Sequence, residues 1–276
     1  MTKTPKYSFY EVEKKGHVAW LFMNRPEKRN ALGADFWDES PLVMKEMDTD
    51  DDVRVVILAG RGNTFCAGID LFFLASELSE YMKPDAMGGK RFTMVKRVLY
   101  FQDAFTAFEA CRKPVIAAIQ GRCIGGGIDL VTACDIRLAS AEALFSVREA
   151  SMSVVPDGGT LQRLPKIVGE GYAKELAFTA KDIDASWAKE IHLVNGVFPD
   201  VEALYAGAET MAAEIAGQAP LAVMAAKEVI HYSREKTVGD GLDYVAQRSA
   251  NILPSKDFFE AIAAFGEKRK PRFTGQ

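Results

Sequence analysis

Short apolar runs alternate with amphipathic stretches along the first two thirds of the chain. The runs rich in β-branched and aromatic residues predict strands, at residues 7–13, 17–23, 53–58, 115–119, 135–139, 144–147 and 193–198. Apolar residues at helical spacing predict helices, at residues 34–47, 71–82, 92–111, 160–168, 172–179 and 184–191. Strands that alternate with helices in this way indicate an α/β fold with parallel strands and crossover helices.

The last quarter of the chain has a different pattern, because it predicts helices only. These helices are expected at residues 201–216, 221–233, 239–251 and 255–265, with a basic tail after them. We therefore expect an α/β core at residues 1–200 and a C-terminal helical module at residues 201–276.

Two residues sit where the helical pattern is interrupted. Pro41 must begin a helical segment or kink one, and Ser40 before it is a candidate N-cap. His192 follows the predicted helix at residues 184–191, where a positive φ at a helix C-terminus is expected.

Two glycine-bearing corners follow predicted strands and offer backbone N–H groups. The first is Ala67-Gly68-Ile69-Asp70, and the second is Gly125-Gly126-Gly127, with Asp129 expected to open the next helix. Glycines leave N–H groups unshielded, and the positive end of a helix adds to their attraction for an anion. If the parallel strands are neighbours, both corners share one end of the sheet. Two N–H groups could then bracket one oxygen, such as the enolate oxygen of a thioester.

Three carboxylates come next, and each has a functional and a structural interpretation. Asp129 could cap a helix, Glu149 could pair with Arg148 or Lys166, and Asp157 could serve as a turn residue. Together they could instead act as acids and bases. Spacing alone leaves both interpretations open. The same holds for the basic residues Arg25, Lys28 and Arg29, which could form a solvated turn or bind phosphates.

Composition narrows the function classes. The net charge of −4 argues against nucleic-acid binding. The four cysteines include no CxxC pair, which favours buried free thiols. Since there is neither an apolar run of roughly 18 residues nor a recognisable targeting signal, we expect no membrane partner and a cytoplasmic location.

Five motifs in order resemble the crotonase (enoyl-CoA hydratase/isomerase) superfamily between residues 18 and 273. They are NRPEKRNAL, FCAGIDL, CIGGGIDLVTACDIR, GTLQRLPKIVG and EKRKPRF. The resemblance implies a spiral of ββα units with C-terminal helices that form trimers, often paired into hexamers. It also implies an acyl-CoA substrate, with no metal and no cofactor beyond the coenzyme A thioester itself.

The resemblance assigns roles residue by residue. It implies that the N–H groups of Ile69 and Gly126 form an oxyanion hole. Hydratases carry glutamates at the positions of Asp129 and Glu149, and usually a glycine at that of Asp157. The trio present here resembles the Δ3,5-Δ2,4-dienoyl-CoA isomerases, in which a proton moves from carbon 2 to carbon 6. We expect Glu149 to act at carbon 2, Asp157 at carbon 6, and Asp129 to tune the pair.

The coenzyme A contacts are expected from the same resemblance, with the last residue supplied by a neighbouring subunit: Arg25, Lys28, Arg29, Ala67, Gly68, Asp70, Leu71 and Lys268. Three alternatives remain open. They are an enoyl-CoA hydratase, a Δ3,Δ2-enoyl-CoA isomerase, and a non-catalytic crotonase-fold binding protein, including one that binds RNA.

Overall fold

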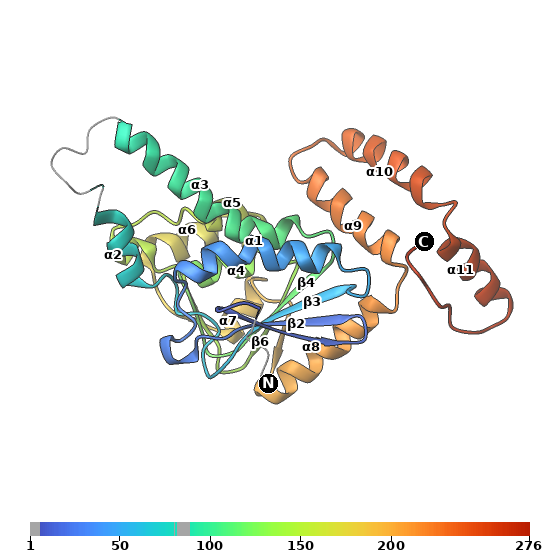
Figure 1. Cartoon of the computed structure of the whole chain (residues 1–276), viewed down its shortest axis with the longest axis horizontal. Coiled ribbons are helices and arrows are strands. Elements are labelled where there is room, and N and C mark those ends of the chain that lie inside the picture. Colours follow the sequence, from blue (N-terminus) through green and yellow to red (C-terminus); the bar gives the residue numbers. More distant parts are fainter. Residues whose placement is uncertain (1–5, 80, 82–88) are drawn as a thin grey trace.

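A six-stranded, mostly parallel sheet forms the centre of the molecule (Figure 1). The computed structural model describes residues 6–79, 81 and 89–276. The strands lie in the order β1-β2-β3-β4-β6-β9, and only β1 and β2 pair antiparallel. Their bounds are Tyr10–Lys15, Val18–Met23, Val55–Gly60, Val115–Ile119, Ile136–Ser140 and Gly196–Phe198. The predicted α/β class with parallel strands is confirmed.

Both faces of this sheet are buried because helices cover them. Leu21 and Leu58 point to the face covered by α1 (Ala34–Thr49) and α3 (Gly89–Ala110). Residues at alternate positions, such as Trp20 and Ile57, pack on the other face against α8 (Val201–Ala216). Alternation between two covered faces explains why these strands are apolar at nearly every position.

A second, three-stranded sheet lies beside the first and was not expected from the sequence. It joins β5 (Arg122–Ile124), β7 (Leu144–Ser146) and β8 (Ile183–Asp184). Strands of two or three residues are too short to show a period of two, so β5 and β8 give no pattern. Between β5 and β8 lie α4 (Gly126–Ala133), α5 (Thr160–Val168), α6 (Glu170–Thr179) and the 3₁₀ turn η2 (Glu149–Met152).

Two local predictions need correction, and a third lies partly outside the described residues. The helix α1 runs through Pro41, so Ser40 is not an N-cap, and its hydroxyl donates to the Phe36 carbonyl at 2.6 Å. The helix α4 begins at Gly126, which places Asp129 within its first turn and not at its start. The helix α2 is described over Leu71–Ser79, and residues 80 and 82, which the prediction included, lie outside the described part of the chain.

Two local predictions are confirmed. His192, two residues beyond the last residue of α7 (Ala185–Glu190), has φ 64°. The four cysteines are buried free thiols.

The last three helices extend from one side of the core as a separate arm (Figure 1). They are α9 (Pro220–Ser233), α10 (Val238–Ile252) and α11 (Lys256–Gly266). The expected division after residue 200 stays a prediction, and the packing of α8 on the sheet favours a boundary after α8. Within the described ranges, no helix combines the length and the apolar character needed to cross a membrane.

The burial of β3 predicts where the stability of the fold resides. Leu58 is 0% exposed, so Leu58→Ala should lower the free energy of unfolding in urea by roughly 2–5 kcal/mol. Leu42→Ala on α1 is the control, since Leu42 is 60% exposed and its loss should cost less than about 0.5 kcal/mol. Equal losses in the two variants would contradict this account of the core.

Candidate active site

Backbone hydrogen bonds join the two glycine corners at the carboxyl end of the central strands. Cys66 N–H donates to the Arg122 carbonyl at 2.9 Å, and Ile124 N–H donates back to the Cys66 carbonyl at 3.0 Å. On the other side, Leu32 N–H donates to the Gly68 carbonyl at 2.9 Å. The segment around residues 66–69 is therefore held between β5 and residue 32, which fixes its distance from the second corner.

The N–H groups of Ile69 and Gly126 are left free by this arrangement. Within the described part of the chain, neither N–H donates to a backbone or side-chain acceptor. A Cβ placed on Gly126 would lie 3.7 Å from the Ile69 nitrogen, so the two groups are close. Gly125 has φ 53° and ψ −116°, which only glycine adopts without strain, and this turn begins α4. Two unpartnered N–H groups this close have the geometry to bind one oxygen atom, and we refer to them as the candidate oxyanion receptor.

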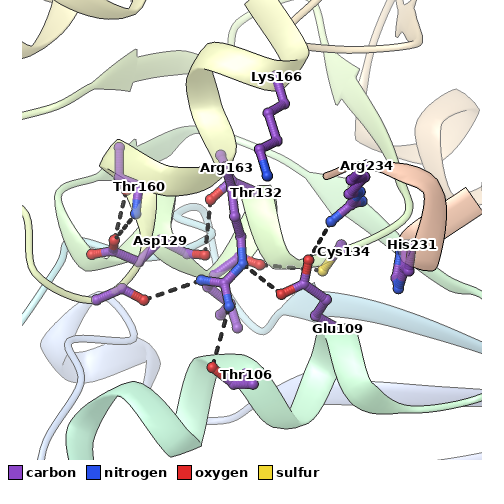
Figure 2. Close-up of polar contacts among 12 residues, drawn as sticks. Thr106, Glu109, Asp129, Thr132, Cys134, Thr160, Arg163, Lys166, His231 and Arg234 are labelled. Carbon is purple, nitrogen blue, oxygen red and sulfur yellow. Dashed lines mark hydrogen bonds and ion pairs between the residues drawn. The ribbon is translucent and has the colours of Figure 1, made fainter. Parts of the chain in front are cut away.

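Asp129 is buried beside this receptor, with 4% of its surface exposed. Its Oδ1 accepts hydrogen bonds from the Thr160 backbone N–H at 2.7 Å and from the Thr160 hydroxyl at 2.6 Å (Figure 2). A Cβ on Gly158 would lie 2.7 Å from the Asp129 Cγ, so the loop before α5 packs directly on the carboxyl group. Asp129 is thus the acceptor for the start of α5 and does not cap its own helix.

Glu149, the first residue of η2, borders the same receptor from the other side. A Cβ on Gly125 would lie 3.2 Å from the Glu149 Oε1. The Oε2 atom is buried and has no hydrogen-bond partner among the described residues. The alternative ion pairs are wrong, because Arg148 pairs with Asp182 and Lys166 pairs with Glu235. An unpartnered buried carboxylate oxygen is costly, which points to a functional role.

Asp157 lies on the loop just before Gly158. Its backbone carbonyl accepts a hydrogen bond from the Gln102 side chain at 2.7 Å. Because this loop also touches Asp129, the structure brings the three predicted carboxylates to one region.

Burial raises the pKa values of all three groups, and repulsion between carboxylates adds to the rise for Glu149 and Asp129. Burial, followed by the Asp129 charge, raises the pKa of Glu149 to about 7. Burial raises the pKa of Asp129 to about 6, against the hydrogen bonds from Thr160, which lower it. Burial also raises the pKa of Asp157. Carboxylic acids that titrate near neutral pH can both accept and donate protons.

The expected coenzyme A residues divide into paired and free groups. Arg25 donates through Nη1 to the Asp70 carboxylate at 2.9 Å and to the Ala31 carbonyl at 3.1 Å, so this nitrogen is engaged inside the protein. Asp70 also accepts a hydrogen bond from the Phe72 N–H at 3.0 Å, at the start of α2. Leu71, the first residue of this helix, is exposed.

Lys28 and Arg29 are exposed on the turn beside the first corner. The Arg29 carbonyl accepts the Ala67 N–H at 3.0 Å, which places this turn against Ala67 and Gly68. Lys268 lies two residues beyond the end of α11, and within the described chain no hydrogen bond or ion pair joins it to these residues.

Four residues of this region were missed in the sequence analysis: Gln102, Phe105, Thr160 and Arg163. Phe105 packs between the second corner and the loop before α5, since a Cβ on Gly126 would lie 3.7 Å from its ring and one on Gly158 would lie 2.6 Å from it. Phe105 belongs to an apolar stripe that indicates core packing only. Thr160 follows two glycines at a predicted helix start, which was the available signal for its contact with Asp129.

A family model and individual relatives both relate this chain to one protein family. The family model for enoyl-CoA hydratase/isomerase matches residues 13–276. The chain is 47% identical over 256 residues to the peroxisomal Δ3,5-Δ2,4-dienoyl-CoA isomerase of Arabidopsis thaliana, covering 93% of this chain and 92% of the relative. It is 42% identical to the mitochondrial enzyme of the same name from Mus musculus, covering 92% of this chain and 77% of the relative.

Solved structures agree with this family. The crystal structure of an enoyl-CoA hydratase from Bacillus anthracis matches with a TM-score of 0.89 and 34% identity, covering 98% of this chain and all of that chain. The predicted crotonase-like fold is therefore confirmed.

The expected cytoplasmic location is wrong by the same comparisons. The relative from Arabidopsis thaliana is named peroxisomal and the one from Mus musculus is named mitochondrial. An inference from the lack of targeting signals is too weak to stand against these names.

The raised pKa of Glu149 predicts a pH-dependent stability. Between its ordinary pKa of 4.5 and about 7, the folded chain keeps a proton that the unfolded chain has released. Stability therefore falls as pH rises through this window. Glu149→Gln should raise the free energy of unfolding at pH 8 by roughly 1–3 kcal/mol, because one pKa unit equals about 1.4 kcal/mol. This gain should vanish near pH 4.5.

Urea denaturation at a series of pH values measures this difference. Glu190→Gln, at an exposed position, is the matched control and should show no comparable pH-dependent gain. A constant difference between Glu149→Gln and the wild type from pH 4.5 to pH 8 would show that Glu149 is not a buried acid.

Proposed function

Because this chain belongs to the enoyl-CoA hydratase/isomerase family, we propose that it isomerises 3,5-dienoyl-CoA thioesters to 2,4-dienoyl-CoA thioesters. The relatives named Δ3,5-Δ2,4-dienoyl-CoA isomerase support this choice. The observation that carries it is the presence of Asp157 on the loop that packs against Asp129, with Glu149 at the same oxyanion receptor. Two separate acid/base groups suit a proton transfer between distant carbons.

The proposed reaction begins at the thioester. The N–H groups of Ile69 and Gly126 bind the carbonyl oxygen, and Glu149 removes a proton from carbon 2. The electron pair of that C–H bond enters the conjugated system and gives a dienolate, whose negative charge the two N–H groups stabilise. Asp157 then donates a proton to carbon 6, which moves the double bonds from positions 3 and 5 to positions 2 and 4.

The protonation states required by this sequence agree with the surroundings of the acids. Glu149, with a pKa of about 7, is ionised often enough to accept a proton near neutral pH. Burial keeps the pKa of Asp157 above its ordinary value, which favours the protonated donor form. A proton returns from Glu149 to Asp157 before the next turnover. Asp129, fixed by Thr160, contributes its charge and holds the loop, and it need not exchange protons with the substrate.

An enoyl-CoA hydratase is the second candidate, as is a Δ3,Δ2-enoyl-CoA isomerase. The structural similarity to the enoyl-CoA hydratase from Bacillus anthracis is the reason to test hydratase activity. Hydratase activity is measured directly with crotonyl-CoA, whose enoyl thioester absorbance disappears as water is added. Fast hydration without turnover of a 3,5-dienoyl-CoA would reject the proposed isomerase.

Coenzyme A binding and oligomer formation belong to the same proposal. Lys28 and Arg29 are the exposed cations next to the first corner, and we assign them to the phosphates. Lys268 reaches a site only from a neighbouring subunit, which requires an oligomer. The C-terminal arm supports one because it exposes many large apolar side chains, among them Ile230, Val238, Leu242, Phe259, Ile262 and Phe265.

Loss of the second acid should slow the isomerisation strongly and leave substrate binding intact. Asp157→Asn keeps the size and turn preference of the residue but cannot donate an acidic proton, so kcat for a 3,5-dienoyl-CoA should fall roughly 10²- to 10⁴-fold. KM should stay close to the wild-type value. The product is measured by the absorbance of the conjugated 2,4-dienoyl thioester.

Asp103→Asn, on the exposed side of α3, is the control for the same chemical change outside the site. It should keep the wild-type kcat. Full dienoyl isomerase activity in Asp157→Asn would sink the proposed proton transfer.

The oligomer is tested by light scattering coupled to size-exclusion chromatography. We expect the mass of a trimer or a hexamer for the wild type. Charge in the exposed face of α11, introduced by Phe259→Asp together with Ile262→Asp, should lower the mass because it opposes burial of that face. Leu42→Asp is the control, because it places the same charge at an exposed apolar residue of α1, and it should leave the mass unchanged. A monomeric wild type would remove the role given to Lys268.

A further inference from the structure

A polar cavity of about 600 Å³ lies behind the loop that carries Asp157. It is bounded by α3, by the start of α5 and by the end of α9. Its wall includes Gly158 and Gly159, so the cavity and the candidate active site share this loop. Figure 2 shows the side chains that meet here from the three helices, with Arg163 at their centre.

Arg163 uses each of its three guanidinium nitrogens in a different contact. Its Nε donates to the Glu109 carboxylate at 2.9 Å, its Nη1 donates to the Gly158 carbonyl at 3.2 Å, and its Nη2 donates to the Thr106 hydroxyl at 3.2 Å. The side chain is only 11% exposed. A rigid, planar group with this many satisfied donors holds its partners in one geometry.

The loop is confined between this guanidinium and the buried acid. On one side, a Cβ on Gly158 would lie 2.7 Å from the Asp129 Cγ. On the other, a Cβ on Gly159 would lie 1.8 Å from the Arg163 Nη1, so the guanidinium rests directly on the backbone. The backbone of residues 158–159 therefore has contacts on both sides, and its position sets that of Asp157.

We propose that Arg163 is a positioning residue for the isomerisation, which holds the 157–159 loop so that Asp157 stands at its productive distance from Glu149. Arg163 touches neither the proposed substrate nor the reacting carbons, and it acts through the Gly158 carbonyl. This inference rests on the proposed function, because it assigns Asp157 a place in the reaction.

The same contact reaches the C-terminal arm. Glu109 pairs through one oxygen with Arg163 and through the other with Arg234, the residue after the last turn of α9. Both arginines lower the pKa of Glu109, which stays ionised in spite of its burial. The chain of charge-assisted contacts Arg234–Glu109–Arg163 thus joins the arm to the loop. Docking of α9 and the position of Asp157 are coupled through these three side chains.

A general electrostatic effect of the cavity would give a different pattern of variants. Lys166 lines the same cavity and carries the same charge, but it pairs with Glu235 at 2.9 Å and does not contact the loop. Lys166→Gln therefore removes a cation from the cavity without releasing residues 157–159. It is the matched control for Arg163.

Steady-state kinetics of Arg163→Met, Arg163→Lys and Glu109→Gln test the proposal. Arg163→Met should lower kcat roughly 10²-fold, the size expected when a catalytic group is displaced by about 1 Å. KM should change little, because the oxyanion receptor and the coenzyme A contacts are untouched. Arg163→Lys should recover part of kcat, since an ammonium can hold Glu109 or the Gly158 carbonyl but not three partners.

Glu109→Gln should lower kcat to an intermediate value, because Arg163 and Arg234 lose their shared charge partner. Lys166→Gln should keep the wild-type kcat. Circular dichroism and the oligomeric mass identify folded variants. A folded Arg163→Met enzyme with wild-type kcat would overturn the proposal. A variant that raises KM and keeps the wild-type kcat would overturn it too. If Arg163→Met does not fold, Glu109→Gln decides, and wild-type kcat in that variant overturns the proposal.

The wild type is assayed first with a 3,5-dienoyl-CoA and with crotonyl-CoA. Lack of dienoyl turnover by the wild type rejects the proposed function, and with it the role given to Asp157 in this inference. Dienoyl turnover by the wild type that persists unchanged in the folded Arg163 variants rejects the positioning role alone.

Discussion

Two backbone hydrogen bonds between residue 66 and β5 are the constraint on which the site depends. They join a loop that follows β3 to a corner that follows β4, and they hold the Ile69 and Gly126 N–H groups side by side. Neither group has an acceptor among the residues that the structure describes, since Gly126 begins a helix and Ile69 leads out of a turn. The fold thus keeps two donors unsatisfied at a fixed spacing, which is the property an oxyanion receptor needs.

The carboxylates placed around this receptor oppose folding. Burial of Glu149 and Asp129 raises their pKa values toward neutrality, and one Glu149 oxygen has no partner among the described residues. Two hydrogen bonds from Thr160 compensate Asp129 in part. A sheet buried on both faces supplies the stability that tolerates this cost. Strain of this kind is expected where a site needs an acid to change its charge during the reaction.

The sequence predicted the parts of the fold that repeat locally and missed those fixed by distant contacts. The strands at Val55 and Val115 were visible as apolar runs, and the fold class followed from their alternation with helices. The strand β5 was invisible because its three residues pair with residues 144–146 and bridge to Cys66, all of them distant in sequence. The same limit applies to Arg163, which belongs to a helix motif but contacts α3 and the loop before α5. Asp129 was recognised as a site candidate, while its partner Thr160 was not.

On the proposed mechanism, binding and choice of reaction are carried by separate parts of the site. The receptor fixes the thioester oxygen, and Glu149 beside Gly125 can serve any reaction that starts at carbon 2. The second acid stands on a loop that contributes nothing to the receptor and is held from behind by α3 and α5. A change on that loop can therefore replace one reaction by another without altering thioester binding. This separation explains how hydratases and isomerases can share one scaffold, with a TM-score of 0.89 between this chain and a hydratase.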